Sequence, residues 1–206
     1  MISEIYRDAD LLVVAKPAGL LCVPGLSSPD NLFDRVKRAH PNARVVHRLD
    51  MATSGLVIFA LHYEAQKALG RLFETRNIHK RYKALISGVM ASAGGEVCLP
   101  LLCDWENRPR QKICWQRGKN ALTRFEVESV DRAGDSTRVS LYPVTGRTHQ
   151  LRVHMQALGH GILGDALYVG EESEKRFGRL MLHAEHLGFR HPLSGAPLEL
   201  HSPCPF

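Results

Sequence analysis

The order of apolar and polar residues along the chain predicts a succession of short strands and a few helices. Seven segments, most of them rich in Val, Ile and Leu, are bounded by Gly, Pro, Asp or Ser, as strands are. They are Leu11–Lys16, Gly55–Leu61, Tyr82–Val89, Thr123–Val130, Arg138–Pro143, Leu180–Phe189 and Leu198–His201. Apolar side chains at helical spacing predict three helices. These are Asn31–His40, with Asp30 as the expected N-cap, Tyr63–Thr75, and Thr148–Leu158, which ends at Gly159.

The predicted strands do not alternate regularly with the predicted helices. This order favours an α+β fold on a mixed, mostly antiparallel sheet with flanking helices over a doubly wound parallel sheet. Ala91–Gly95 and Asp131–Asp135 are expected to be hairpin loops, and the polar segment Asp104–Asn120 a long surface loop. Because no linker interrupts the pattern, one continuous domain over residues 1–206, in one or two lobes, is expected.

Composition places the chain among ordinary globular proteins. Hydrophobic residues make up 44% and charged residues 23% of its 206 residues. The longest apolar runs, Leu11–Ala15 and Leu56–Leu61, are far shorter than the roughly 20 residues of a membrane span. The five cysteines show no C-x-x-C spacing and indicate reduced thiols. We therefore expect a cytoplasmic protein that does not contact the membrane.

The net charge of +6, from 27 Lys and Arg against 21 Asp and Glu, suits a polyanionic partner such as nucleic acid. Two basic segments, Arg71–Lys83 and Asp104–Lys119, also carry aromatic side chains, and the second holds both tryptophans. Positive charge binds phosphates and flat side chains stack on unpaired bases. The alternative is a solvated charged face.

Two further clusters offer chemistry. Polar residues of Val45–Gly55 precede the apolar strand 56–61, where a loop on a rigid scaffold commonly carries function. The alternative there is an Asx-type turn between Asp50 and Thr53 with His47 and Arg48 solvated. In Pro143–His154 a strand ends, Gly146 permits a tight turn and a helix begins near Thr148. Arg152, one turn into that helix, is placed to pair with a buried carboxylate or, alternatively, to snorkel to solvent.

Several common catalytic motifs are missing from the sequence. No G-x-S-x-G, Walker A, G-x-G-x-x-G or H-E-x-x-H motif occurs. The commonest signatures of hydrolases, nucleotide-binding proteins and zinc proteases are therefore absent.

The first polar cluster resembles a known motif. His47-Arg48-Leu49-Asp50 followed by Thr53-Ser54-Gly55 is similar to the catalytic motif of the RluA family of pseudouridine synthases. Four further segments resemble other motifs of that family in the same order: Val14–Leu20, Lys80–Tyr82, Val144–His154 and Leu180–Ala184. Within the family, Leu99–Lys112 resembles the member that acts on both 23S ribosomal RNA and tRNA anticodon stem-loops.

The resemblance implies a pseudouridine synthase catalytic domain with a central active-site cleft. It implies no N-terminal S4-type RNA-binding domain, because the first motif begins near residue 13. Asp50 is then the catalytic carboxylate, Arg152 its partner, and Tyr82 the residue that stacks on the target uracil. Arg48 and His47 are expected to act in RNA binding and base flipping, and Leu182 to form an apolar wall. The expected RNA contacts are Lys16, Arg108, Arg110, Lys112 and Arg147.

The implied reaction breaks the glycosidic bond of a uridine, rotates the uracil and rejoins it through carbon, with no cofactor and no metal. The expected partners are stem-loops of 23S rRNA and tRNA, bound by a monomer. Three alternatives stay open: a synthase acting on one of the two RNA classes, a non-catalytic RNA-binding module, and a hydrolase that uses Asp50 with a histidine.

Overall fold

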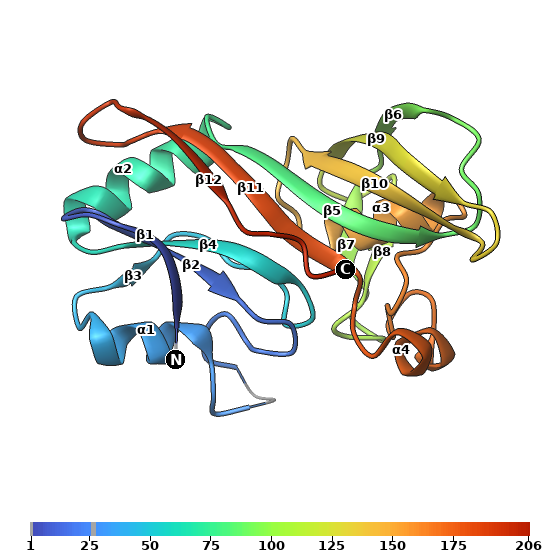
Figure 1. Ribbon diagram of the computed structural model, residues 1–206, viewed down its shortest axis with the longest axis horizontal. Coiled ribbons are helices and arrows are strands. Elements are labelled where there is room, and N and C mark those ends of the chain that lie inside the picture. The colour runs from blue at the N-terminus through green and yellow to red at the C-terminus, as the bar shows by residue number, and fades with distance from the viewer. Residues whose placement is uncertain (1, 26–27) are drawn as a thin grey trace. The chain divides into compact units, whose positions relative to one another are not determined.

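A computed structural model of the chain describes residues 2–25 and 28–206 (Figure 1). These residues form two compact units. The first extends to Lys80 and resumes over His183–Pro205, and the second comprises Arg81–Leu182 together with Phe206. The first unit is therefore built from both ends of the chain.

The first unit contains a mixed sheet and two helices. Its strands follow the order β1-β2-β4-β11, with β3 paired to β4 and β12 paired to β11. The β4–β11 pair is parallel, and the other pairs of this unit are antiparallel. The elements are β1 (Ser3–Arg7), β2 (Leu11–Lys16), α1 (Leu32–Ala39), β3 (Arg44–Val45), β4 (Ser54–Ala60), α2 (Tyr63–Glu74), β11 (Leu182–Arg190) and β12 (Pro197–His201).

Strand β4 is buried along its whole length because helices cover both of its faces (Figure 1). Alternate side chains of a strand point to opposite faces. Leu56 and Ile58 belong to one cluster with Leu69 of α2, whereas Phe59 stacks on Phe33, from α1, with ring centroids 6.1 Å apart. The uninterrupted apolar run in the sequence thus reflects a strand with no solvent-facing side.

The second unit contains an antiparallel sheet, a separate two-stranded hairpin and two helices. The sheet follows the order β5-β10-β9-β6, and β7 pairs with β8. The elements are β5 (His79–Ser87), β6 (Gly94–Cys98), β7 (Leu101–Cys103), β8 (Gln111–Ile113), β9 (Leu122–Asp131), β10 (Ser136–Pro143), α3 (Gln150–Ala157) and α4 (Glu171–Phe177). None of the helices in the described part of the chain combines the length and apolar character of a membrane span.

The structure confirms the predicted α+β class and the mixed, mostly antiparallel pairing. All seven predicted strands are present, with ends displaced by up to three residues. Strands β1, β3, β6, β7 and β8 and helix α4 were not predicted. They are short or polar on their exposed sides, so their sequences lack a clear period.

Several boundaries differ from the predicted ones. The N-cap of α1 is Asn31, whose Oδ1 accepts the N–H of Asp34 at 2.9 Å, rather than Asp30. The supposed loop Asp104–Asn120 contains β8, and Ala91–Gly95 contains the first residues of β6. Helix α3 begins at Gln150, so Thr148 lies outside it.

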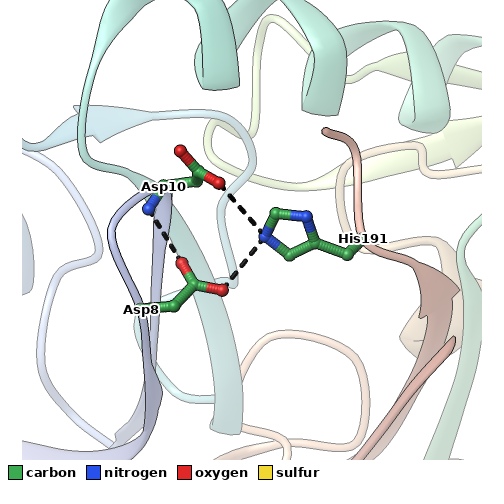
Figure 2. A group of neighbouring side chains, drawn as sticks. All are labelled: Asp8, Asp10 and His191. Carbon is green, nitrogen blue, oxygen red and sulfur yellow. Dashed lines mark hydrogen bonds and ion pairs between the residues drawn. The ribbon is translucent and has the colours of Figure 1, made fainter. Parts of the chain in front are cut away.

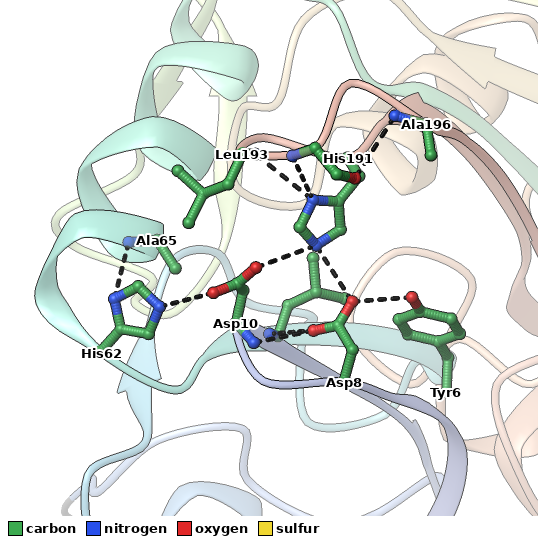
Figure 3. A network of polar contacts seen from close by, with 10 residues as sticks. Tyr6, Asp8, Asp10, His62, Ala65, His191, Leu193 and Ala196 are labelled. Carbon is green, nitrogen blue, oxygen red and sulfur yellow. Dashed lines mark hydrogen bonds and ion pairs between the residues drawn. The ribbon is translucent and has the colours of Figure 1, made fainter.

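Polar side chains join the turn between β1 and β2 to the start of α2 (Figure 3). The hydroxyl of Tyr6 donates to Asp8 Oδ2 at 2.7 Å, and the N–H of Asp10 donates to Asp8 Oδ1 at 2.8 Å. Burial raises the pKa of Asp8, but these hydrogen bonds outweigh it and hold the pKa below its ordinary value. Since Nδ1 of His62 accepts the N–H of Ala65, its Nε2 carries the proton and donates to Asp10 Oδ1 at 2.8 Å.

His191, in the loop between β11 and β12, faces the same two carboxylates (Figure 2). Its Nε2 lies 3.0 Å from Asp8 Oδ2 and 3.6 Å from Asp10 Oδ2. Its Nδ1 accepts the N–H groups of Leu193 and Ser194, which leaves the proton on Nε2. A metal would need the lone pair of Nε2, so this cluster is better suited to joining three chain turns than to holding a cation.

Candidate functional site

Asp50 lies in a turn that directly precedes the buried strand β4. The N–H of Thr53 donates to the Asp50 carbonyl at 3.1 Å, and the N–H of Gly19 donates to the carbonyl of Met51 at 2.9 Å. The neighbouring Leu49 is buried in the core. The half-buried Asp50 is thus presented by a backbone that is anchored on both sides.

Lys16 is part of that anchor. Its side chain is 1% exposed, and Nζ donates to the carbonyls of Pro17, Leu20 and Met51 at 2.9, 2.7 and 2.9 Å. An ammonium has three N–H groups, and backbone carbonyls accept from each. The prediction that Lys16 contacts RNA is therefore wrong: its charge lies inside the protein, where it ties the 17–20 turn to the Asp50 loop.

His47 also lies within the fold. Its Nε2 accepts the N–H of Ile58 at 2.9 Å, and its ring packs against Phe73 with centroids 4.6 Å apart. Burial, together with the nearby charge of Lys80, lowers the pKa of His47 to about 3. The imidazole is neutral at physiological pH and offers RNA no positive charge; the expected role of His47 in RNA binding and base flipping stays a prediction. In the fold, His47 extends the β3–β4 pairing.

Arg48 is exposed, between the anchored His47 and the buried Leu49. The alternative Asx-type turn with both His47 and Arg48 solvated is thus correct for Arg48 alone. The Asp50–Thr53 turn is closed by a backbone carbonyl. The expected action of Arg48 on RNA stays a prediction.

The residues after the turn lock β4 to β11. Ser54 Oγ and His183 Nδ1 are 2.7 Å apart, and His183 Nε2 lies 3.0 Å from the Ser202 carbonyl. Gly55 has φ +115°, and a Cβ at this position would overlap the backbone of Ala184. Only glycine permits this close parallel pairing, which accounts for Ser54-Gly55 in the motif.

In the second unit, Gln150 organises the loop that precedes α3. Its Oε1 accepts from the Thr145 hydroxyl at 2.6 Å and from the Arg147 N–H at 3.0 Å. Its Nε2 donates to the Leu122 carbonyl and to Thr123 Oγ1. One buried amide therefore binds the 145–147 turn to β9.

Arg152 forms a buried ion pair. Its Nε and Nη2 donate to the two oxygens of Asp165, both at 2.7 Å. The side chains of Arg152 and Asp165 are 5% and 1% exposed. Arg152 therefore does not snorkel to solvent. It pairs with a buried carboxylate, as the first alternative predicted, and that carboxylate is Asp165. The pairing of Arg152 with Asp50 stays a prediction.

Tyr168 links this ion pair to the β7–β8 hairpin. Its hydroxyl accepts the N–H of Gln111 at 2.8 Å and lies 2.7 Å from His149 Nδ1. The guanidinium carbons of Arg152 and Arg110 lie 5.1 and 5.5 Å from its ring centroid, within cation–π range. Sequence reasoning missed Asp165 and Tyr168; a Gly-Asp turn at 164–165 was the available signal.

Tyr82 and Leu182 lie in the second unit with Arg152, whereas Asp50, Arg48, His47 and Lys16 lie in the first. Tyr82 is half-buried in β5, opposite Leu141 of β10. Leu182 is buried at the start of β11, and its expected role as an apolar wall stays a prediction.

The other predicted RNA contacts are exposed cations of the second unit. Arg108 lies over the ring of Trp105, 4.4 Å from its centroid. Lys112 Nζ donates to Asp104 at 2.9 Å, and Arg147 Nε donates to the Asn120 carbonyl at 3.1 Å. These contacts orient the side chains and leave their charge at the surface, as Arg110 also does.

The low pKa of His47 predicts a pH-dependent stability. The unfolded chain binds a proton at His47 below about pH 6.5, whereas the folded chain does so only near pH 3. The free energy of unfolding therefore falls as pH drops between these values, by up to about 1.4 kcal/mol per pH unit. In urea titrations, His47→Gln is expected to lose about 2 kcal/mol less than the wild type between pH 7 and pH 5.

The exposed His79 provides a matched control for that experiment, and His79→Gln is expected to keep the wild-type slope. Equal pH dependence in the wild type and His47→Gln would contradict the neutral state of the half-buried His47.

Comparison with known proteins agrees with these features. A family model described as RNA pseudouridylate synthase matches residues 10–157. The chain is 48% identical to the dual-specificity RNA pseudouridine synthase RluA of Yersinia pestis, over 94% of this chain and 95% of that protein. Identity to the RluA of Escherichia coli K12 is also 48%, over 98% of this chain and 93% of that protein.

Among solved structures, human RNA pseudouridylate synthase domain containing 1 is similar, with a TM-score of 0.85 and 34% identity. The similarity covers 100% of this chain and 84% of that one. The 48% identity over nearly the whole chain and the matched family model agree with the anchored Asp50 turn. This chain belongs to the RNA pseudouridylate synthase family.

Proposed function

We propose that the protein converts specific uridines of structured RNA to pseudouridine, with Asp50 as the catalytic carboxylate. The observation that carries the proposal is the Asp50 turn, held by Lys16 and Leu49 within the segment that the family model matches. Residues 1–206 act in this proposal as one catalytic domain.

The proposed substrates are stem-loops of 23S rRNA and tRNA. Relatives that share 48% identity over nearly the whole chain are named dual-specificity RNA pseudouridine synthases. The protein acts as a cytoplasmic monomer in this proposal, which light scattering of the pure protein and fractionation of cells test directly.

The isomerisation needs a carboxylate but no net oxidation. The bond from N1 of uracil to C1′ breaks, the base rotates, and C5 bonds to C1′; the C5 proton is lost and N1 gains one. Asp50 acts as nucleophile or base, both of which require its ionised form. A stacked uridine must leave the helix to reach such a group, at a cost of a few kcal/mol.

Arg48 and Tyr82 are assigned to the flipped base. The exposed guanidinium of Arg48 is planar and both stacks and hydrogen-bonds, so it suits the space that the uridine vacates. Tyr82 stacks on the uracil, its hydroxyl serves a proton step, and Leu182 forms the apolar wall.

Arg152 is assigned to orienting the catalytic carboxylate. Asp165 engages its Nε and Nη2, and a guanidinium has five N–H groups, so it has the capacity to bind a second carboxylate. Asp165 and Tyr168 then act as positioning residues that hold Arg152. The exposed Arg108, Arg110, Lys112 and Arg147 bind phosphates, so RNA affinity falls steeply with salt.

Asp50→Asn is expected to lower the rate of isomerisation by about 10³-fold or more, since it removes the acting carboxylate. Folding and RNA affinity should persist. The measurement is a pseudouridine map of rRNA and tRNA incubated with each protein. Asp135→Asn, at an exposed turn whose φ of 46° suits Asn, is the matched control. Substantial modification by Asp50→Asn contradicts the assignment, and free uracil would identify a hydrolase.

Arg48→Ala is expected to slow single-turnover conversion at saturating RNA, because base flipping precedes chemistry. An unchanged rate in Arg48→Ala removes its flipping role.

Tyr82→Phe keeps the stacking ring and is expected to lose the proton step. Full activity in Tyr82→Phe shows that only the ring matters.

Asp165→Asn is expected to destabilise the fold by about 3 kcal/mol, because the buried Arg152 loses the carboxylate that engages its Nε and Nη2. The double variant Arg152→Met/Asp165→Asn removes both charges and keeps an Oδ1 that accepts the N–H groups of Leu167 and Tyr168, so its stability should return toward the wild-type value. If Arg152 serves the reaction, the double variant folds yet stays inactive. Wild-type activity in the stable double variant would show that the pair is only structural.

A further inference from the structure

The β7–β8 hairpin and its flanking loops present an unusual surface. We call it the hairpin face and define it by Trp105, Arg108, Arg110, Lys112 and Trp115, all exposed. The side chains of Trp105 and Trp115 have exposed fractions of 67% and 73%. Tryptophan has the largest side chain, and leaving it in water forfeits the stabilisation of burial.

The hairpin face is held in place by backbone contacts. Gln111 of β8 donates to Tyr168, the N–H of Cys114 donates to the Pro100 carbonyl at 2.9 Å, and the N–H of Gly118 donates to the Cys114 carbonyl at 2.8 Å. Leu101 of β7 is buried in a cluster that includes Val153 of α3. The exposed rings are therefore carried by an ordered element rather than by a loose loop.

The charge of this segment indicates the partner. Residues 104–120 contain five cationic side chains (Arg108, Arg110, Lys112, Arg117, Lys119) and two acidic ones (Asp104, Glu106). Lys112 forms a surface ion pair with Asp104 at 2.9 Å, and the segment keeps an excess of positive charge. An apolar protein partner would not call for this excess, whereas a nucleic acid supplies phosphates for the cations and bases for the rings.

Arg108 makes one ring ready for stacking. Its guanidinium carbon lies 4.4 Å from the centroid of Trp105. The contact restrains both flat groups before RNA arrives, which lowers the ordering cost of binding.

We propose that Trp115 and the Trp105–Arg108 pair form a stacking platform for unpaired bases of the RNA substrate. The inference rests on the proposed function and extends it: the face reads single-stranded loop bases, while Arg110 and Lys112 bind the adjoining phosphates. The platform contributes to substrate docking and takes no part in bond breaking.

Intrinsic fluorescence tests the platform directly, because Trp105 and Trp115 are the only tryptophans of the chain. A base stacked on indole quenches its emission. Titration with a stem-loop RNA is expected to quench Trp105→Phe and Trp115→Phe, each of which retains one indole. A fully paired duplex of the same length should quench neither. Equal quenching by the duplex, or none by the stem-loop, overturns the proposal.

Alanine variants test its weight in catalysis. Trp105→Ala and Trp115→Ala are each expected to lower kcat/KM for stem-loop RNA about tenfold, since one base–aromatic stack is lost. The single-turnover rate at saturating RNA should stay unchanged. Leu193→Ala, at a side chain that is 51% exposed in the first unit, is the matched control.

Wild-type kcat/KM in both tryptophan variants overturns the platform even when the wild type makes pseudouridine. Failure of the wild type to make any pseudouridine refutes the proposed function instead, whatever the fluorescence shows. A lower saturating rate with unchanged RNA affinity would assign the tryptophans to catalysis and likewise overturn the docking role.

Discussion

Strand β4 is enclosed on both faces, by α2 against Leu56 and Ile58 and by α1 through Phe59. A charged side chain inside such a strand would lose its hydration without compensation. The polar residues of the motif therefore fall in the turn that precedes β4, with Ser54 paired to His183 at the transition. The position of Asp50 follows from this constraint, because the buried strand holds the end of its turn.

Buried polar groups complete the positioning of the candidate residues. Lys16 gives its three donors to carbonyls around the Asp50 turn, and Arg152 shares two hydrogen bonds with Asp165. Removing one partner from such an arrangement lowers the stability of the fold, because the remaining group stays buried without its hydrogen bonds and away from water. Functional groups held in this way vary little in orientation, which suits a reaction that requires fixed geometry.

The cations predicted as site residues separate into two groups, internal and exposed. Lys16 and Arg152 are internal and maintain the fold around the candidate residues. Arg48, Arg108, Arg110, Lys112 and Arg147 are exposed and create the field that a polyanion meets. The net charge of +6 counts both groups, and in the proposed function only the exposed group contributes phosphate contacts and their salt dependence.

The sequence by itself determined the fold class, most strands and helices, and the family. Apolar periodicity reports burial of whole elements, and the HRLD motif is a local signal that survives without coordinates. The short strands β7 and β8 escaped, since three residues show no period. Helix α3 starts later than predicted because His149 adopts a left-handed conformation, with φ 54°.

Tertiary structure alone decided which polar residues face water. Lys16 and His47 are of residue types that commonly contact RNA. In the fold, however, Lys16 is surrounded by backbone carbonyls, and His47 accepts the N–H of Ile58 and packs beside Phe73. Asp165 and Tyr168 carry no strong motif, yet they hold Arg152 from 13 and 16 residues away in sequence. Burial and pairing depend on contacts between distant segments, and residue type and spacing do not encode these contacts locally.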